Sequence, residues 1–504
     1  MLKWSRCLLL VVPLGFFPML GCAGGVGVSP TSPSAPAASY QVVTISDLHF
    51  NPLYDPSLFP QLVAAAPSQW DAIYRTSTIS APSIGGTDTN YPLLAYALAS
   101  VYQTMQQNQS NSPVVLFTGD LLGHNIPANY CAAQYSPNPP PPDCVTNESS
   151  AIQTFINNTF TFVAGKMRTA VGTAPVIYVP GNIDTYSGGY GPSTSFLVAN
   201  GATVYSEFLN GVGDNATFTS NFETGGYYSV APLGSNLLVV GLNSNSFVYG
   251  WPSYGSADTE IAWLDAQLQA AQNAGQKVWI LMHVPPGANA QEIVLAAPVP
   301  KDVNASLFAN EAEDMWQWDP GVQKSFMDTL NRYPGVVTLM LAGHTHMDEF
   351  RMLAPGYVVE QLPSISPCFG NNPAYKVLTV TQDTFTPTDY QSFDFNLASQ
   401  MPLPFLPLYD FSSTYGATQG PLANSLAQLY PQLDSNPSTL DMYRFFYTSG
   451  GQGVNPSTQS PWNPINDLNW PIFGCTIGEA DEPGYISCVN TSEPSTTDSA
   501  PAHH

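Results

Sequence analysis

Six short apolar segments, each ending at a turn, limit the folds that this chain can adopt. They span residues 40–46, 113–118, 174–180, 237–242, 277–282 and 336–341. Nearly continuous apolar runs of this length, bounded by turn residues, are typical of strands that are buried on both faces of a sheet. The sequence therefore predicts the buried strands of an α/β sheet.

Helical patterns lie between the later strands. Apolar residues recur at helical spacing before Gly275 and again before the pair Pro334-Gly335. The first set is Ile261, Leu264, Leu268 and Ala271, and the second set is Val322, Phe326 and Leu330. Glycine commonly follows the last residue of a helix. This alternation supports an α/β architecture, in which functional sites gather at the carboxyl ends of the strands.

The composition changes after about residue 385, where proline, aromatic residues and short helical stretches such as 425–447 dominate. We predict a catalytic domain at 40–385, a mostly helical C-terminal subdomain at 386–490 and a polar tail at 491–504.

The N-terminus has the pattern of an export signal. Two basic residues precede the apolar run 7–20, which is too short for a stable spanning helix. Met19-Leu20-Gly21-Cys22 resembles a bacterial lipobox, so residues 1–22 are predicted to be a signal and residues 23–39 a flexible tether. The protein is then exported. It is either an outer-membrane lipoprotein, attached to the membrane only by the lipid on Cys22, or a periplasmic or extracellular protein released by ordinary signal cleavage.

Export implies an oxidising compartment, in which cysteines pair. Cys131 and Cys144 enclose a proline-rich loop, and Cys475 and Cys488 lie at the same spacing near the C-terminus. We predict these two local disulfides, which leaves Cys368 free, although connectivity does not follow from sequence alone.

The charge balance excludes one class of partner. The chain has 12 Lys and Arg residues against 36 Asp and Glu residues, and its net charge is −24. Such a surface repels polyanions, so we do not expect nucleic acid to bind. The sequence pI of about 4.2 suggests adaptation to an acidic environment.

The five histidines that precede the C-terminal tip all lie in short polar motifs near the ends of the predicted strands. These motifs are Asp47-Leu48-His49, Gly119-Asp120 with His124, Gly181-Asn182, His283, and Gly343-His344-Thr345-His346. Imidazole is a common ligand of zinc, iron and manganese, and the neighbouring carboxylates complete such a shell. Asp-x-His, Gly-Asp and Gly-Asn are weak signals alone, since Gly-Asp and Gly-Asn also mark plain turns. Two alternate histidines after a strand rarely serve packing only.

In their order along the chain, these motifs resemble the calcineurin-like metallophosphoesterase superfamily. The resemblance implies a four-layer α/β/β/α sandwich, in which two packed sheets are flanked by helices, and two divalent metal ions. The ligands that it implies are Asp47, His49 and His346 for one ion, Asn182, His283 and His344 for the other, and Asp120 for both. The resemblance favours zinc, and a ligand set without thiolate also suits iron or manganese.

Longer stretches resemble the acid sphingomyelinase-like phosphodiesterases. They are residues 283–287 (HVPPG), 343–350 (GHTHMDEF), 364–367 (SISP) and 370–375 (GNNPAY). The likeness is to the members without a saposin domain. It implies a helical C-terminal extension and hydrolysis by a hydroxide held between the two ions.

The chain departs from the family pattern at one catalytic position. The usual Gly-Asn-His is Gly181-Asn182-Ile183, so one candidate general acid is absent. His124, four residues after Asp120, matches the other histidine of the group, and we assign it as the general acid that protonates the leaving group. The alternative is that His124 only forms a hydrogen bond with a loop.

Three functions are compatible with this site. The first is hydrolysis of a phosphodiester or pyrophosphate bond in a small-molecule or lipid substrate, such as a sphingomyelin headgroup or a nucleotide derivative, by a monomeric enzyme. The second is phosphomonoesterase or endopolyphosphatase activity at the same site. Endopolyphosphatases of the same wider group also tend to lack the histidine that Ile183 replaces, so this position favours polyphosphatase activity. Polyphosphate requires a basic channel, however, and the scarcity of basic residues disfavours this activity. The third is a surface lipoprotein that binds metal without turnover.

Overall fold

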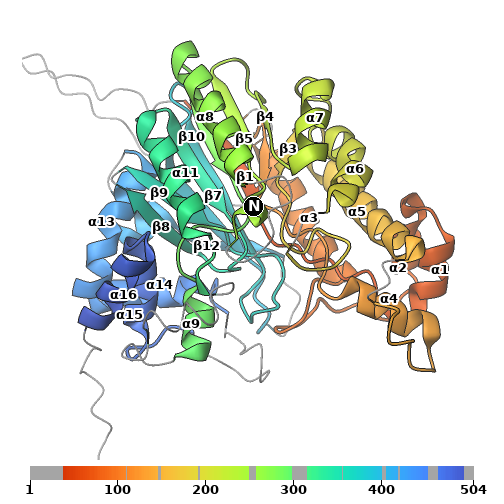
Figure 1. Cartoon of the computed structure of the whole chain (residues 1–504). Coiled ribbons are helices and arrows are strands. Elements are labelled where there is room, and N and C mark those ends of the chain that lie inside the picture. Colours follow the sequence, from red (N-terminus) through yellow and green to blue (C-terminus); the bar gives the residue numbers. More distant parts are fainter. Residues whose placement is uncertain are drawn as a thin grey trace, which may run out of the picture. The chain divides into compact units, whose positions relative to one another are not determined.

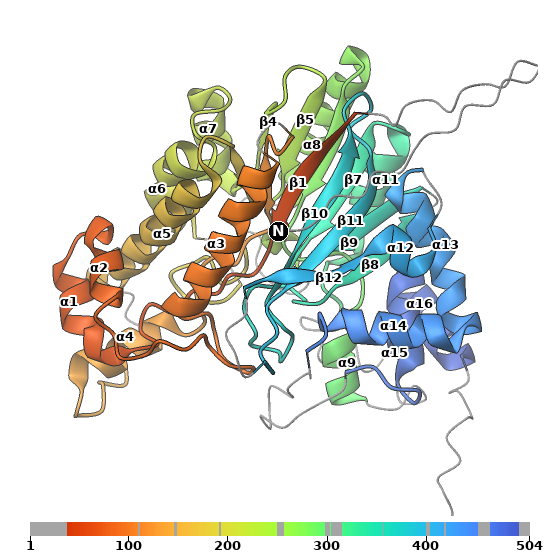
Figure 2. The same cartoon turned by 180° about the vertical axis from the view of Figure 1, so that it is seen from behind.

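The computed structural model describes residues 38–108, 111–145, 149–190, 193–248, 257–297, 303, 315–354, 356–399, 404–417, 420–451 and 464–492. Two six-stranded sheets lie at the centre, and helices cover their outer faces (Figures 1 and 2). All six strands predicted from the apolar runs are present, and the predicted four-layer α/β/β/α sandwich is confirmed.

The first sheet has the strand order β12-β11-β10-β1-β2-β3. Its strands are β1 (Ser39–Ile45), β2 (Val115–Phe117), β3 (Val176–Tyr178), β10 (Ala374–Thr381), β11 (Pro387–Asp394) and β12 (Leu406–Asp410). Strands β1, β2 and β3 are parallel, whereas β10, β11 and β12 continue the sheet as antiparallel neighbours. The carboxyl ends of β1, β2 and β3 therefore meet at one edge.

The second sheet has the order β4-β5-β6-β7-β9-β8. Its strands are β4 (Tyr228–Val230), β5 (Leu237–Gly241), β6 (Lys277–Leu281), β7 (Val337–Ala342), β8 (Glu349–Ala354) and β9 (Tyr357–Gln361). Strands β5, β6, β7 and β9 are parallel, and β4 and β8 are antiparallel at the two margins.

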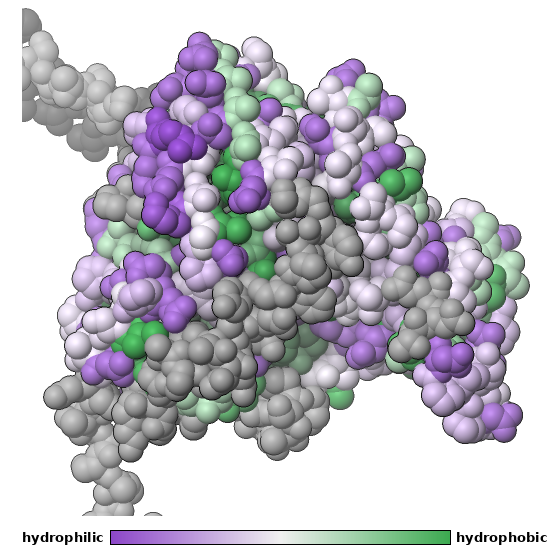
Figure 3. All heavy atoms as spheres, in the orientation of Figure 1, coloured by the Kyte–Doolittle hydropathy of each residue, from purple (hydrophilic) through white to green (hydrophobic). Residues whose placement is uncertain are grey.

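The alternating side chains of β6 divide between two hydrophobic cores. Trp279 and Leu281 belong to the core that includes the first sheet, whereas Val278 and Ile280 belong to the core beneath α8 (Ala257–Ala274) and α11 (Pro320–Arg332). Successive side chains of a strand point to opposite faces, so β6 is covered on both sides. Hydrophilic side chains gather on the outer surface over α8 and α11 (Figure 3), as expected for amphipathic helices on a sheet.

The other helices lie before β6, between β6 and α11, or after β12. Their bounds are α1 (Phe59–Ala64), α2 (Trp70–Tyr74), α3 (Tyr91–Gln107), α4 (Ile126–Tyr135), α5 (Ser150–Val171), α6 (Thr194–Thr203), α7 (Asn215–Gly225), α9 (Ala290–Ala296), α12 (Phe411–Tyr415), α13 (Leu422–Ser435), α14 (Pro437–Tyr447), α15 (Trp470–Gly478) and α16 (Glu482–Thr491), with short turns η1 (Pro56–Leu58), η2 (Pro67–Gln69), η3 (Val204–Phe208) and η4 (Ser244–Phe247).

The predicted boundary at residue 385 needs a correction. Residues 386–490 were expected to form a helical subdomain, but β11 and β12 extend the first sheet, and helices begin only at α12. Strand β11 pairs with β10, and β12 pairs with β11, and such pairings depend on neighbours that a local pattern does not reveal. Helices α13 to α16 lie together beside β8 and β9 (Figure 1). They support the loop after β7, because the carbonyl of Tyr447 accepts a 3.0 Å hydrogen bond from the backbone N–H of Asp348.

Both predicted disulfides form, Cys131–Cys144 and Cys475–Cys488, and Cys368 carries a free thiol. The signal at 1–22 with Cys22, nearly all of the tether at 23–39 and most of the tail at 491–504 lie outside the described residues. Within the ranges given above, no helix combines the length and the apolar character that a membrane span requires.

Candidate metal centre

The polar motifs meet where the carboxyl ends of the parallel strands from both sheets approach each other. The first sheet contributes Asp47 and His49 after β1, Asp120 after β2 and Asn182 after β3, and the second contributes His283 after β6 and His344 and His346 after β7. Six of these side chains belong to residues that are at most 7% exposed, and His344 is partly exposed. A buried cluster of four imidazoles, two carboxylates and one amide thus forms between residues nearly 300 positions apart.

Backbone strain is concentrated at these positions. Asp47, His49, Asp120, His344 and His346 have φ angles of +49°, +40°, +54°, +73° and +66°. Residues other than glycine seldom adopt this left-handed region, and each instance costs about 1–3 kcal/mol. The fold holds these side chains at sharp turns where regular strand geometry would separate them.

The glycines of the motifs are required by close packing. A Cβ atom on Gly181 would collide with the backbone nitrogen and side chain of Asp120, and one on Gly343 would collide with the side chains of Ser46 and Asp47. The Gly-Asn and Gly-His pairs therefore allow a ligand from one strand to lie directly against the next strand.

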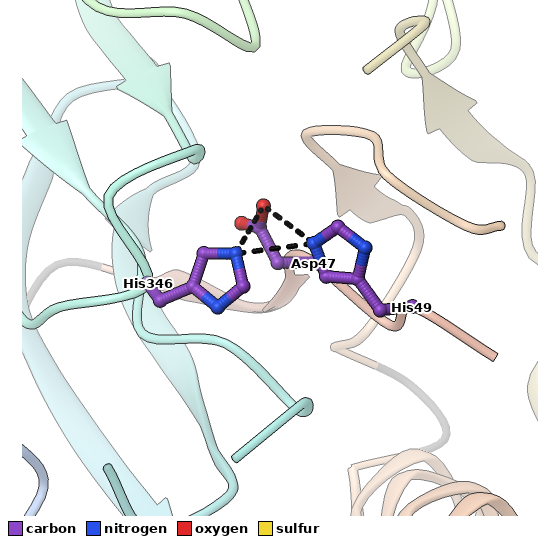
Figure 4. Close-up of side chains that lie close together, drawn as sticks. All are labelled: Asp47, His49 and His346. Atoms are coloured by element: carbon purple, nitrogen blue, oxygen red, sulfur yellow. Dashed lines mark hydrogen bonds and ion pairs between the residues drawn. The ribbon is translucent and has the colours of Figure 1, made fainter. Parts of the chain in front are cut away.

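One half of the cluster consists of Asp47, His49 and His346 (Figure 4). The Nε2 atoms of His49 and His346 lie 3.1 Å apart, and Asp47 Oδ1 lies 3.4 Å from His346 Nε2 and 3.7 Å from His49 Nε2. The backbone N–H of His344 donates to both carboxylate oxygens of Asp47 at 3.2 and 3.1 Å, which fixes the orientation of this carboxylate.

The other half consists of Asn182, His283 and His344. Asn182 Oδ1 lies 2.8 Å from His283 Nε2 and 3.0 Å from His344 Nδ1. Asp120 joins the halves, because its Oδ2 lies 3.3 Å from His49 Nε2 and 3.2 Å from His283 Nε2. Its Oδ1 accepts a 2.8 Å hydrogen bond from the backbone N–H of Ile183. The main chain thus orients Asp120, and this contact does not depend on which side chain residue 183 carries.

Outer hydrogen bonds determine which ring nitrogen faces inward. His49 Nδ1 lies 3.1 Å from the carbonyl of Leu122, and His283 Nδ1 lies 2.7 Å from the carbonyl of Thr118. Each Nδ1 must carry a proton to donate to a carbonyl, so in the neutral rings each Nε2 presents a lone pair to the cluster.

This donor set fits divalent metal ions. The inward nitrogens converge on carboxylate and amide oxygens, and so many lone pairs repel each other unless positive charge lies between them. Two ligands bound to one ion at about 2.0–2.2 Å are separated by about 2.8–3.6 Å at octahedral or tetrahedral angles. The distances of 2.8–3.7 Å within each half agree with that geometry.

The pKa shifts of the side chains in the cluster also indicate that a positive charge is favourable there. Burial lowers the pKa of His49 and of His283, but Asp120 and other nearby carboxylates outweigh it and raise both pKa values to about 9. Burial and the charge of His283 lower the pKa of His344 to about 3. Although burial alone would raise the pKa of Asp120, His283 and His49 hold it well below its usual range. The carboxylates thus favour a cation in the cluster, whereas His344 stays neutral.

His124 lies beside this cluster, and its side chain is 34% exposed. Its ring stacks on that of His49 with the centroids 4.2 Å apart, and its Nδ1 lies 2.8 Å from Asp88 Oδ1. Asp88 Oδ2 also accepts a 2.7 Å hydrogen bond from the backbone N–H of His124. The sequence did not indicate Asp88, which lies in a loop without a recognisable motif.

Comparisons with known proteins agree with these features. The sequence profile described as calcineurin-like phosphoesterase matches residues 40–348. Sphingomyelin phosphodiesterase B of Dictyostelium discoideum is 23% identical over 500 residues, which cover 92% of this chain and 67% of that protein. Sphingomyelinase phosphodiesterase D of the same organism is 23% identical over 477 residues, or 86% of this chain and 94% of that protein. Cyclic GMP-AMP phosphodiesterase SMPDL3A of Homo sapiens is 23% identical over 398 residues, or 74% of each.

Proposed function

This chain belongs to the calcineurin-like phosphoesterase family, and we propose that it is an exported phosphodiesterase whose substrate is a phospholipid headgroup or a nucleotide derivative. It resembles the acid sphingomyelinase-like members, as its motifs predicted, and it is a metal-dependent phosphodiester hydrolase. The observation that carries the proposal is the position of Asp120 Oδ2, which lies 3.3 and 3.2 Å from ligand nitrogens of the two halves of the cluster.

The proposed ligands are those that the resemblance implied. Asp47, His49 and His346 would hold one ion, Asn182, His283 and His344 would hold the other, and Asp120 would contribute to both. Two divalent ions in such a site polarise phosphate oxygens and make hydroxide available near neutral pH. Zinc is the proposed metal, because nitrogen ligands predominate and the resemblance favours it, and iron and manganese are compatible with the same ligands.

The protein itself supplies the proton for the leaving group. Asp88 holds Nδ1 of His124, so Nε2 is the ring nitrogen that protonates the departing alkoxide. The His124 ring stacks on His49, a residue of the cluster, and this position supports its assignment as the acid. Its partial exposure suits a group that must exchange protons with solvent between turnovers.

Charge and relatives support the substrate class. The names of the relatives describe both sphingomyelin and cyclic GMP-AMP as substrates of those proteins, and each is a phosphodiester. A net charge of −24 disfavours long polyanions such as polyphosphate and favours zwitterionic or small substrates. Two disulfides support export to an oxidising compartment.

An aryl phosphodiester and the matching monoester test the reaction. We expect metal-loaded enzyme to cleave the diester faster than the monoester, and chelator or Asp120→Asn to abolish cleavage. Asp328→Asn, on the exposed face of α11, is the matched control and should keep full activity. Preference for the monoester, or bound metal without any turnover, would refute the proposal. A panel of sphingomyelin vesicles, a cyclic dinucleotide and polyphosphate then identifies the substrate class.

A further inference from the structure

His344 differs from the other three histidines of the cluster in which ring nitrogen faces inward. His49 and His283 present Nε2 inward, and backbone carbonyls accept from their Nδ1 atoms. His344 instead presents Nδ1, 3.0 Å from Asn182 Oδ1, and its Nε2 lies 2.9 Å from the hydroxyl of Tyr190. The outer nitrogen of this ring therefore faces a side chain, as does Nδ1 of His346, which lies 3.3 Å from Cys368 Sγ.

We propose that Tyr190 is a positioning residue that fixes the tautomer and the ring orientation of His344. The inference rests on the proposed metal assignment. When Nδ1 binds an ion through its lone pair, the ring proton must be on Nε2, where it donates to the phenolic oxygen of Tyr190. A rotation of the ring by 180° would exchange the inward nitrogen for a carbon, and the hydrogen bond to Tyr190 opposes that rotation.

The loop that carries Tyr190 has its own internal support. Thr185 is 2% exposed, and its hydroxyl accepts from the backbone N–H of Gly188 at 3.0 Å and donates to the carbonyl of Gly189 at 3.1 Å. Asp184 ties the start of the loop to the strand ends, because it accepts from the backbone N–H of Gly181 at 3.0 Å and of Leu121 at 2.9 Å. The loop that carries Tyr190 begins at the proposed ligand Asn182, and these hydrogen bonds stabilise the position from which the tyrosine hydroxyl contacts His344.

The aromatic ring adds a second contact. The rings of Tyr190 and His344 lie 5.8 Å apart at 67°, an edge-to-face arrangement that also restricts rotation of the imidazole. Loss of the hydroxyl alone keeps this packing, so Tyr190→Phe isolates the effect of the hydrogen bond.

The experiment compares Tyr190→Phe with Tyr186→Phe. Tyr186 is on the same loop and is 4% exposed, but its hydroxyl pairs with Asn157 at 2.9 Å, away from the cluster. Outer partners of metal-bound histidines are worth about 10–100-fold in metal affinity. We expect competition with a chromogenic chelator to show such a loss for Tyr190→Phe at one of two zinc sites, and no change at the other site or in Tyr186→Phe.

Cobalt substitution gives a readout that a general loss of stability would not move. The visible spectrum of the cobalt-loaded Tyr190→Phe protein should change at one site, while its denaturation midpoint without metal stays equal to that of the wild type. Wild-type metal affinity and spectrum in Tyr190→Phe would overturn the role of Tyr190 and leave the proposed function intact. A wild-type protein that binds no metal would instead refute the proposed function.

Discussion

Glu260 allows the dependence of folding on pH to be calculated and tested. It lies in the first turn of α8 and is 2% exposed, and its carboxylate accepts from the backbone N–H of Asn243 at 2.7 Å and from the hydroxyl of Ser246 at 3.2 Å. Burial raises its pKa from 4.5 to about 8, because two neutral hydrogen bonds only partly replace water. The turn that it holds also supports the metal centre, since Ser244 Oγ accepts from the backbone N–H of His283 at 3.1 Å.

The sign follows from the protons that each state binds. Below pH 4.5 Glu260 is protonated in both states, and between pH 4.5 and about 8 only the folded state keeps the proton, so this group lowers stability as the pH rises. At about 1.4 kcal/mol per pKa unit, the penalty is about 3 kcal/mol at pH 7 and about 5 kcal/mol above pH 8. Glu260→Gln keeps an acceptor oxygen and carries no charge, so we expect it to be more stable than the wild type by about these amounts.

Urea denaturation of the metal-free proteins between pH 4.5 and 8.5, with the disulfides intact, measures this difference. The gain of Glu260→Gln should shrink towards zero near pH 4.5. Asp258→Asn, which changes an exposed residue in the same turn of α8, is the control and should show no comparable trend. Equal stability of Glu260→Gln and the wild type at pH 7–8, or a gain that is constant with pH, would refute the reasoning.

Three further changes test the site and the fold. Asp88→Asn should lower turnover about tenfold or more on substrates with poor leaving groups, because it weakens the hold on His124; an equal loss on activated aryl esters, or a loss of metal in elemental analysis, would contradict this role. Gly343→Ala should reduce the metal content below two ions per chain, because the new Cβ would lie 2.7 Å from Asp47 Oδ2, and full occupancy would show that the strand ends can separate. Cys475→Ala should lower the free energy of unfolding by about 3 kcal/mol, measured by urea titration, since it opens a loop of 13 residues; an unchanged midpoint would show that the bridge is dispensable.

The apolar runs and their periodicity predicted much of the fold, because these signals are local. Six strands, the helices α8 and α11, and both disulfides agree with the sequence analysis. Strands β11 and β12 were not predicted, since their pairing follows from the position of β10 in the sheet. The polar motifs at the strand ends likewise indicated the candidate ligands before any coordinates.

The sequence alone determined which side chains are available as ligands, because each motif directly follows an apolar run that its local pattern identifies as a strand. Only the tertiary structure decided how they are held. Asp88 reaches His124 from a loop 36 positions earlier, and Tyr190 reaches His344 across 154 positions. Such contacts depend on how loops from different strands pack against each other, and no periodicity in the sequence records that distance.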